Sequence, residues 1–195
     1  SVAPDKFTVD VTPPEGSITA KSVEGRSETW ENKLIGKNLT FGFWSKKKIS
    51  ITGTKLDKTS PIQSVQYYKA SSKGAKDYMT EYTVEQLERI TDGWTDFDTV
   101  KGFELIPNEQ CVIYVRIIDK AGNRTYISTN GFVLDDKAPQ HELLAPQITI
   151  NPQQPINGIY KKDVNVNVEV EEPVSGGTYS GLKTVSYKVF NRAVN

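Results

Sequence analysis

The chain has 195 residues, of which 24 are basic and 24 are acidic, so its formal net charge is zero. A chain without a basic excess lacks the electrostatic footprint of a nucleic-acid binder, and no run approaches the roughly 18 consecutive apolar residues of a membrane span. Its single Cys, Cys111, excludes an internal disulfide, and its single His, His141, leaves one candidate base for a Ser/His or Cys/His site. We therefore expect no enzyme activity, no catalytic residue and no cofactor, and neither nucleic acid as a partner nor a membrane span in this segment.

Short runs that alternate apolar and polar residues follow one another along the chain. They lie at 49–54, 62–69, 111–118, 125–133 and 164–170, separated by clusters of Gly, Pro, Asn and Asp. The last run places Val at every second position, which predicts a strand with one buried face. Strands at these intervals predict an all-β fold, an antiparallel β-sandwich.

One segment carries a helical pattern. Thr83 and Gln86 have the spacing of a capping box, in which each residue caps the backbone of the other. Tyr82 precedes the cap and can pack onto Leu87 across the first turn. The sequence therefore predicts one short inserted helix at about 83–91.

A tight hairpin is expected at 119–123, where the sequence DKAGN joins two strands and Gly122 or Asn123 supplies a positive φ. The Asp and Asn of this loop, with Asp135 and Asp136 at the following junction, could also offer oxygens to a cation. Turn geometry is the better explanation, because Asx residues beside Gly cap such turns routinely. We assign no metal site.

The chain repeats itself at long range. Residues 10–14 and 135–139 share an Asp followed four residues later by Pro, and 62–67 align with 182–187, at offsets of 125 and 120 residues. These offsets predict one module of about 120 to 130 residues.

Four segments follow from this repeat. Residues 1–10 are the tail of a preceding module or a linker, 11–137 a complete β-sandwich, 138–146 a linker, and 147–195 the front part of a second, incomplete module. Its three strands cannot close two facing sheets and would leave unpaired edges.

Large aromatic residues are divided between core and surface in this prediction. Trp44 and Trp30 are expected in the core, because a sandwich without disulfides needs large buried side chains. The segment 71–98 contains more aromatic and charged residues than a minimal sandwich requires.

We predict that this segment carries the partner-binding surface, whose residues are Tyr78, Tyr82, Glu85, Arg89 and Trp94. In the alternative reading, Leu87, Ile90 and Trp94 merely seal one open edge of the sandwich. Both readings can be true, because a helix that covers the sandwich still exposes its own outer face.

Four stretches together resemble tandem bacterial Ig-like repeats of Gram-positive surface proteins: LTFGFW at 39–44, the strand at 49–54, SVQYY at 64–68 and RIIDKAGNRTYIST at 116–129. GLKTVSYKVF at 181–190 resembles a related repeat type. The resemblance implies Ig-like sandwich repeats, an extracellular location, secreted or cell-wall attached, and no shared catalytic residues. Such proteins serve as stalks, adhesins or binders of host proteins, and some from gut commensals bind immunoglobulin variable domains as superantigens.

The resulting hypothesis is a non-enzymatic extracellular binding module of a bacterial surface repeat protein. Its expected partners are a host protein, with immunoglobulin Fab as the candidate, and the neighbouring Ig-like modules of the same chain. The first alternative is a passive stalk or spacer repeat of an adhesin. The second is an accessory glycan-binding module, which predicts an exposed aromatic strip on one sheet face.

Overall fold

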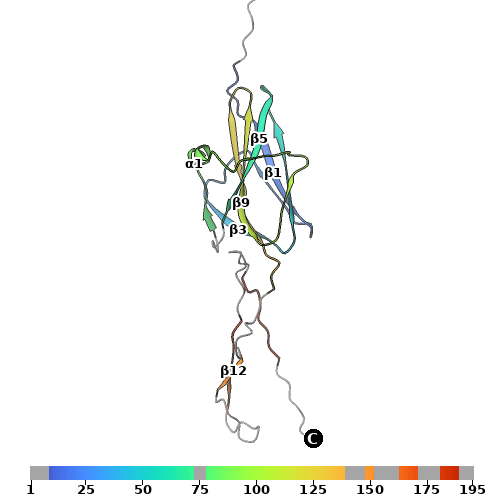
Figure 1. The fold of residues 1–195 in the computed structure, drawn as a ribbon, viewed down its shortest axis with the longest axis vertical. Coiled ribbons are helices and arrows are strands. Elements are labelled where there is room, and N and C mark those ends of the chain that lie inside the picture. The colour runs from blue at the N-terminus through green and yellow to red at the C-terminus, as the bar shows by residue number, and fades with distance from the viewer. Residues whose placement is uncertain (1–8, 73–77, 139–147, 152–162, 171–180, 189–195) are drawn as a thin grey trace, which may run out of the picture.

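The computed structural model describes residues 9–72, 78–138, 148–151, 163–170 and 181–188. Strands β1 to β11 form two sheets packed face to face, and β12 (Ile148–Asn151) pairs with β13 (Asn165–Val168) in a separate hairpin (Figure 1). The described residues include one helix, α1 (Val84–Arg89), which lies beside the larger sheet. The predicted all-β sandwich with one short inserted helix is confirmed.

The smaller sheet contains four strands joined by antiparallel pairing. Their order is β2 (Ser27–Glu31), β1 (Glu15–Ser22), β4 (Ile49–Leu56) and β8 (Phe103–Leu105). Ile18 and Ala20 of β1 and Ile49 and Ile51 of β4 are fully buried, and in each strand they stand two residues apart. This sheet therefore turns one apolar face toward the larger sheet.

The larger sheet is built around the long strand β9. Its order is β6 (Tyr78–Thr80), β3 (Asn38–Ser45), β11 (Gly131–Leu134), β9 (Glu109–Asp119), β5 (Ile62–Ser71) and β7 (Thr95–Asp96), and β10 (Arg124–Ser128) pairs with the second half of β9. All neighbours are antiparallel except β3 and β11, which run parallel with a bulge.

The prediction of one continuous strand at 125–133 is wrong, because this segment forms two strands, β10 and β11. The N–H of Thr129 donates to the carbonyl oxygen of Ile113 at 3.0 Å, and the Thr129 hydroxyl accepts from the N–H of Ile113 at 3.0 Å. These two bonds satisfy the backbone where the regular ladder is interrupted.

Two hydrophobic cores result, because β9 is buried on both faces. Cys111, Ile113, Val115 and Ile117 pack between the two sheets, while Val112 and Tyr114 face the opposite side of the larger sheet. A strand of this kind has a nearly continuous apolar sequence rather than a simple alternation. The second core needs a cover of its own, and the segment that contains α1 supplies it.

The prediction that Trp44 is buried is wrong, since this side chain is 42% exposed. Phe41 and Phe43 are both buried, in a strand whose buried and exposed residues alternate, and this two-residue period leaves Trp44 exposed. Trp30 is partly buried and packs edge-on against Phe132 at a centroid distance of 5.8 Å.

The strand predicted at 164–170 is present as β13, but its predicted buried face is wrong. Val166 is 56% exposed and Val168 is 41% exposed. β13 pairs with β12, and no second sheet covers it within the described residues. Most of the predicted linker at 138–146 lies outside the described residues, so the module boundaries remain predictions.

The chain enters the sandwich at one end and leaves it at the opposite end. Near the start, the backbone carbonyl of Asp10 accepts a hydrogen bond from Asn123 in the β9–β10 hairpin. After β11, the N–H of Asp135 donates to the carbonyl oxygen of Ser45, at the end where β9 begins. Figure 1 shows these two ends at the top and bottom of the sandwich.

Candidate functional site

Helix α1 begins at the predicted capping box. The N–H of Gln86 donates to the Thr83 hydroxyl at 3.3 Å, and the N–H of Thr83 donates to the Gln86 side chain at 2.8 Å. Hydrogen bonds from Thr83 and from its own backbone hold the pKa of Glu85 below its usual value. The helix is confirmed, although it covers 84–89 rather than 83–91.

Leu87 is the one buried residue of α1 and anchors the helix to the larger sheet. It belongs to the second core, which the residues Leu39, Phe41, Ala70, Val112, Tyr114, Tyr126 and Val133 complete. The helix therefore covers the outer face of this sheet, whereas the alternative reading expected it to seal an open edge. The remaining five side chains of α1 are exposed.

Five aromatic rings lie between this segment and the sheet, and we call them the aromatic cluster: Tyr68, Tyr82, Trp94, Tyr114 and Tyr126. The rings of Tyr82 and Tyr114 are stacked at 5.4 Å, and Trp94 lies 5.7 Å from Tyr68 and 6.4 Å from Tyr126. The guanidinium of Arg116 lies 4.2 Å from the centre of the Trp94 ring, within the range of a cation–π interaction.

Polar contacts fix the same cluster. The indole N–H of Trp94 donates to the carbonyl oxygen of Ile90 at 3.2 Å, and the N–H of Tyr82 donates to the hydroxyl oxygen of Tyr114 at 2.9 Å. Burial raises the pKa of Tyr114, so its hydroxyl stays protonated at neutral pH. Tyr82 and Trp94 are thus half-buried parts of the fold as well as predicted site residues.

Glu81 is a structural residue that the sequence prediction missed. Its buried carboxylate accepts hydrogen bonds from the N–H groups of Ile35 and Gly36 and from the hydroxyl of Ser128. This carboxylate holds residues 34–36 against the larger sheet. These partners are more than 40 residues away in the chain, so no local pattern could have indicated the role.

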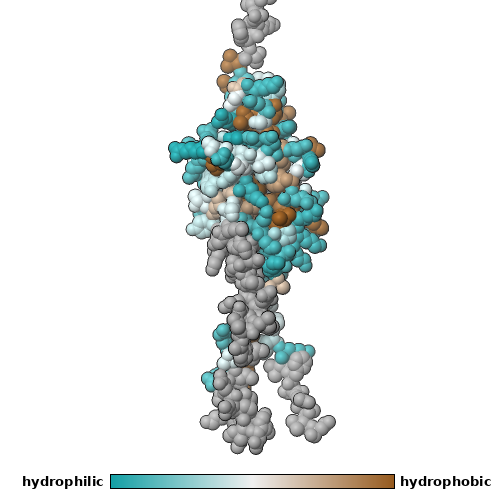
Figure 2. Space-filling view, in the orientation of Figure 1, coloured by the Kyte–Doolittle hydropathy of each residue, from teal (hydrophilic) through white to brown (hydrophobic). Residues whose placement is uncertain are grey.

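The exposed part of the predicted site consists of Tyr78, Glu85 and Arg89. Tyr78, on β6, is 57% exposed, and the two charged residues project from α1. With Val84 and Glu88 they form what we call the α1 surface. Figure 2 shows hydrophilic side chains at the position of α1 in Figure 1. Glu88 pairs with Arg124 of β10 at 3.3 Å, which connects this surface to the sheet below it.

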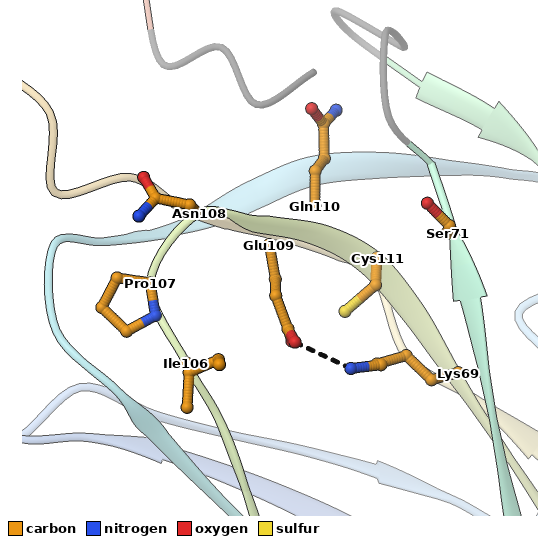
Figure 3. Close-up of a pocket in the computed structure, with 8 residues that line it drawn as sticks. All are labelled: Lys69, Ser71, Ile106, Pro107, Asn108, Glu109, Gln110 and Cys111. Atoms are coloured by element: carbon orange, nitrogen blue, oxygen red, sulfur yellow. Dashed lines mark hydrogen bonds and ion pairs between the residues drawn. The ribbon is translucent and has the colours of Figure 1, made fainter. Parts of the chain in front are cut away.

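A pocket of about 390 Å³ lies elsewhere, at the end of the sandwich where β9 begins (Figure 3). Its lining includes the ion pair between Lys69 and Glu109 at 2.8 Å, and the buried thiol of Cys111. Burial raises the pKa of Cys111 to about 12, so the thiol is protonated at neutral pH and is a poor nucleophile. His141, the single candidate base, lies outside the described residues.

Two facing β-sheets, whose strands pair largely antiparallel, define an Ig-like β-sandwich, a class of module that suggests protein interactions and is typically not catalytic. The chain belongs to the bacterial Ig-like domain family, whose sequence model matches residues 12–136. No curated protein and no solved structure matches the chain. No helix among the described residues is long and apolar enough to cross a membrane.

Proposed function

We propose that this chain is a non-enzymatic, extracellular binding module of a bacterial surface repeat protein, and that it binds a host protein through the α1 surface. One observation carries the proposal. Helix α1 is attached through Leu87, and its five other side chains are exposed. The outer face of the helix, with its mixed charges, is therefore accessible to a partner while Leu87 holds the helix on the sheet.

The chemistry of the α1 surface suits contact with a protein. Tyr78 and Arg89 are residue types that often dominate binding energy at interfaces, and Glu85 adds a charge of opposite sign. An exposed helix face is also a common recognition element. Tyr82 and Trp94 contribute by holding this face in place, since their rings pack in the aromatic cluster.

Immunoglobulin variable domains are the candidate partner, and this choice rests on the resemblance to superantigen-type repeats. The test is biolayer interferometry of residues 1–195 against polyclonal human Fab, with Fc and a glycan panel as controls. Binding to Fab of many specificities is expected, because a superantigen recognises framework residues. A folded chain that binds neither Fab nor Fc nor glycan contradicts the proposed partner.

Single substitutions test the surface itself. We expect Tyr78→Ala and Arg89→Ala each to weaken Fab binding by about tenfold or more, since exposed aromatic and Arg anchors carry much of an interface's energy. The matched controls are Glu31→Ala and Lys55→Ala, which remove exposed side chains from the smaller sheet. Unchanged affinity in both surface variants, with their folding intact, would place the contact elsewhere.

The stalk hypothesis has its own supporting observation, because the chain enters and leaves the sandwich at opposite ends. Modules connected in this way extend end to end. This alternative predicts no affinity for Fab, Fc or glycans in the same experiment.

The glycan hypothesis has less support. The exposed aromatic residues described on the sandwich are Trp44 and Tyr78. Tyr78 pairs with Thr40, four residues from Trp44 along β3, a separation of roughly 13 Å. Two rings so far apart do not form a continuous strip.

A further inference from the structure

Strand β2 lies at the edge of the smaller sheet. Among the described residues it pairs with β1 alone, so no strand lies beside its second side. The β1–β2 ladder is regular from the pair of Lys21 and Ser27 to the pair of Ser17 and Glu31, without a bulge. A regular edge strand offers a row of backbone groups to which another strand can bond.

The hydrogen bonds at the two ends of this ladder show which backbone groups of β2 point outward. At one end, the N–H of Ser22 donates to the carbonyl oxygen of Arg26 at 2.8 Å. At the other end, the N–H of Asn32 donates to the carbonyl oxygen of Gly16 at 3.0 Å. Hydrogen-bonded pairs alternate with non-hydrogen-bonded pairs in an antiparallel ladder, so the even-numbered residues of β2 bond to β1. Its odd-numbered residues therefore turn their N–H and C=O groups toward the open side.

The side chains of β2 give little protection to this edge. Edge strands are usually protected by a proline, a bulge or charges, and β2 has neither proline nor bulge. Its first charge, Glu28, is paired with Arg26, whose Nε donates to the carboxylate at 3.1 Å. Its second charge, Glu31, takes part in no ion pair of the described residues. An approaching strand must therefore avoid a negative charge opposite Glu31.

We propose that β2 pairs antiparallel with β2 of a second copy of this chain, across a two-fold axis at Thr29. In this register Thr29 lies opposite Thr29 of the second copy, and Ser27 lies opposite Glu31. These are the residues whose backbone groups point outward, and each such pair exchanges two N–H···O=C bonds. A shift by one residue would instead place these groups opposite groups that already bond to β1. On the other face of the strand, Glu28 lies opposite Trp30.

The charges near β2 suit this register. Glu31 lies opposite the uncharged Ser27 of the second copy, and Ser27 is itself paired with Lys21 on β1. Glu31 of each copy therefore shares a row with Lys21 of the other, and no like charge lies opposite it. At the axis, Thr29 already hydrogen-bonds to Thr19 at 3.0 Å, so the pairing joins two such Thr pairs into one row. A foreign strand would find the same backbone groups, but a second copy supplies the match of charges by symmetry.

The pairing would join two sandwiches that point in opposite directions. β1 begins at the end where the chain enters, since the Thr125 hydroxyl of β10 donates to the carbonyl oxygen of Pro14. The turn between β1 and β2 lies toward the other end, where Glu24 pairs with Lys47 at 4.0 Å. β2 therefore runs back along the sandwich, and an antiparallel partner has its entry end beside the exit end of the first copy. This contact suits chains that meet from opposite directions and lies on the sheet that does not carry α1.

The experiment measures self-association of residues 1–195 by sedimentation velocity. Concentrations run from about 10 µM to about 1 mM, because a contact this small forms a weak complex. A monomer–dimer equilibrium is expected, since a two-fold contact closes after two copies. A chain that stays monomeric throughout overturns the proposal and leaves β2 available to a strand of another protein. Growth beyond the dimer would likewise contradict a two-fold contact.

Substitutions at Ser27 test the register by the direction of their effect. Ser27→Glu places a carboxylate opposite Glu31 twice in the dimer and is expected to weaken dimerisation by about threefold or more. Ser27→Lys places an ammonium group there and should strengthen dimerisation by a similar factor. The same two substitutions at Ser50, an exposed residue of β4 in the same row, are the matched controls and should have much smaller effects. If both Ser27 variants shifted the equilibrium in the same direction, the register would be wrong.

Disulfide formation under a mild added oxidant locates the two-fold axis. Cys111 does not interfere, because it is buried and its pKa is raised to about 12. Thr29→Cys is expected to give a disulfide-linked dimer, because opposite Cα atoms lie about 5.5 Å apart and a disulfide spans about 4.4 to 6.8 Å. Ser27→Cys is the matched control, because its two copies lie four residues apart in this register, roughly 13 Å. It should cross-link to Glu31→Cys but not to itself, and the opposite pattern would contradict the pairing.

Discussion

Gly131 permits the closest contact between β11 and the second core. A Cβ atom added at this position would overlap the Phe41 ring, a buried part of that core. The absence of a side chain, rather than an unusual φ, is what the position requires. Gly42 on β3 offers the opposite case, because a Cβ atom there would meet no atom within 4 Å.

We predict that Gly131→Ala lowers the free energy of unfolding by about 1 to 3 kcal/mol, since an overpacked core must shift a ring or a strand. Gly42→Ala should change it by less than about 0.5 kcal/mol, as exposed substitutions usually do. Urea denaturation of both variants measures the difference. Equal effects of the two substitutions would show that the contact with Phe41 does not limit the size of the side chain at residue 131.

Helix α1 is an element whose attachment depends on one side chain. Six residues are too short to be stable by helix propensity, so the capping box and the burial of Leu87 must hold it. The aromatic cluster and Glu81 support the loops on either side. The α1 surface is therefore firmly positioned although most of it is exposed.

Leu87→Ala is expected to lower the free energy of unfolding by about 2 to 5 kcal/mol, the usual cost of truncating a fully buried Leu. Val84→Ala is the control, because Val84 is on the same helix and 40% exposed. It should cost less than about 0.5 kcal/mol in the same urea titration. If Leu87→Ala lowered the free energy of unfolding by less than about 1 kcal/mol, well below the usual cost of such a truncation, the helix would be held by its flanking loops instead.

At the scale of the whole molecule, the sandwich and the β12–β13 hairpin are structurally separate. The extensive contacts between elements join strands of the sandwich to one another, or β12 to β13. The exposed Val166 and Val168 also show that the hairpin lacks a covering layer within the described residues. We expect 11–137 to be the folding unit.

This expectation predicts that residues 9–138 alone unfold in one cooperative transition, with a Tm within about 2 °C of that of residues 1–195, a shift that corresponds to less than about 1 kcal/mol. Circular dichroism during heating of both chains measures it. If the shorter chain lost cooperativity or melted more than about 5 °C lower, the C-terminal segment would be shown to support the sandwich.

Local patterns determined the elements whose stabilising contacts lie close in the sequence. The capping box at Thr83, the turn with Gly122 in a positive φ and the alternating strands were all predictable, because each depends on a few neighbouring residues. The site residues Tyr78, Glu85 and Arg89 could likewise be proposed from their place in an inserted segment, and the structure finds all three exposed.

Only the tertiary structure decided which side chains are covered and which distant groups meet. The two-residue period sets the side of β3 on which Trp44 lies, but the elements packed against a strand decide whether that side is covered, as the exposed Trp44 and Val166 show. The contacts of Glu81, and the approach of Asp10, Asp57 and Asp119 to one another, join residues more than 40 positions apart. Period and capping act within a few residues, whereas burial and convergence are properties of the packed sheets.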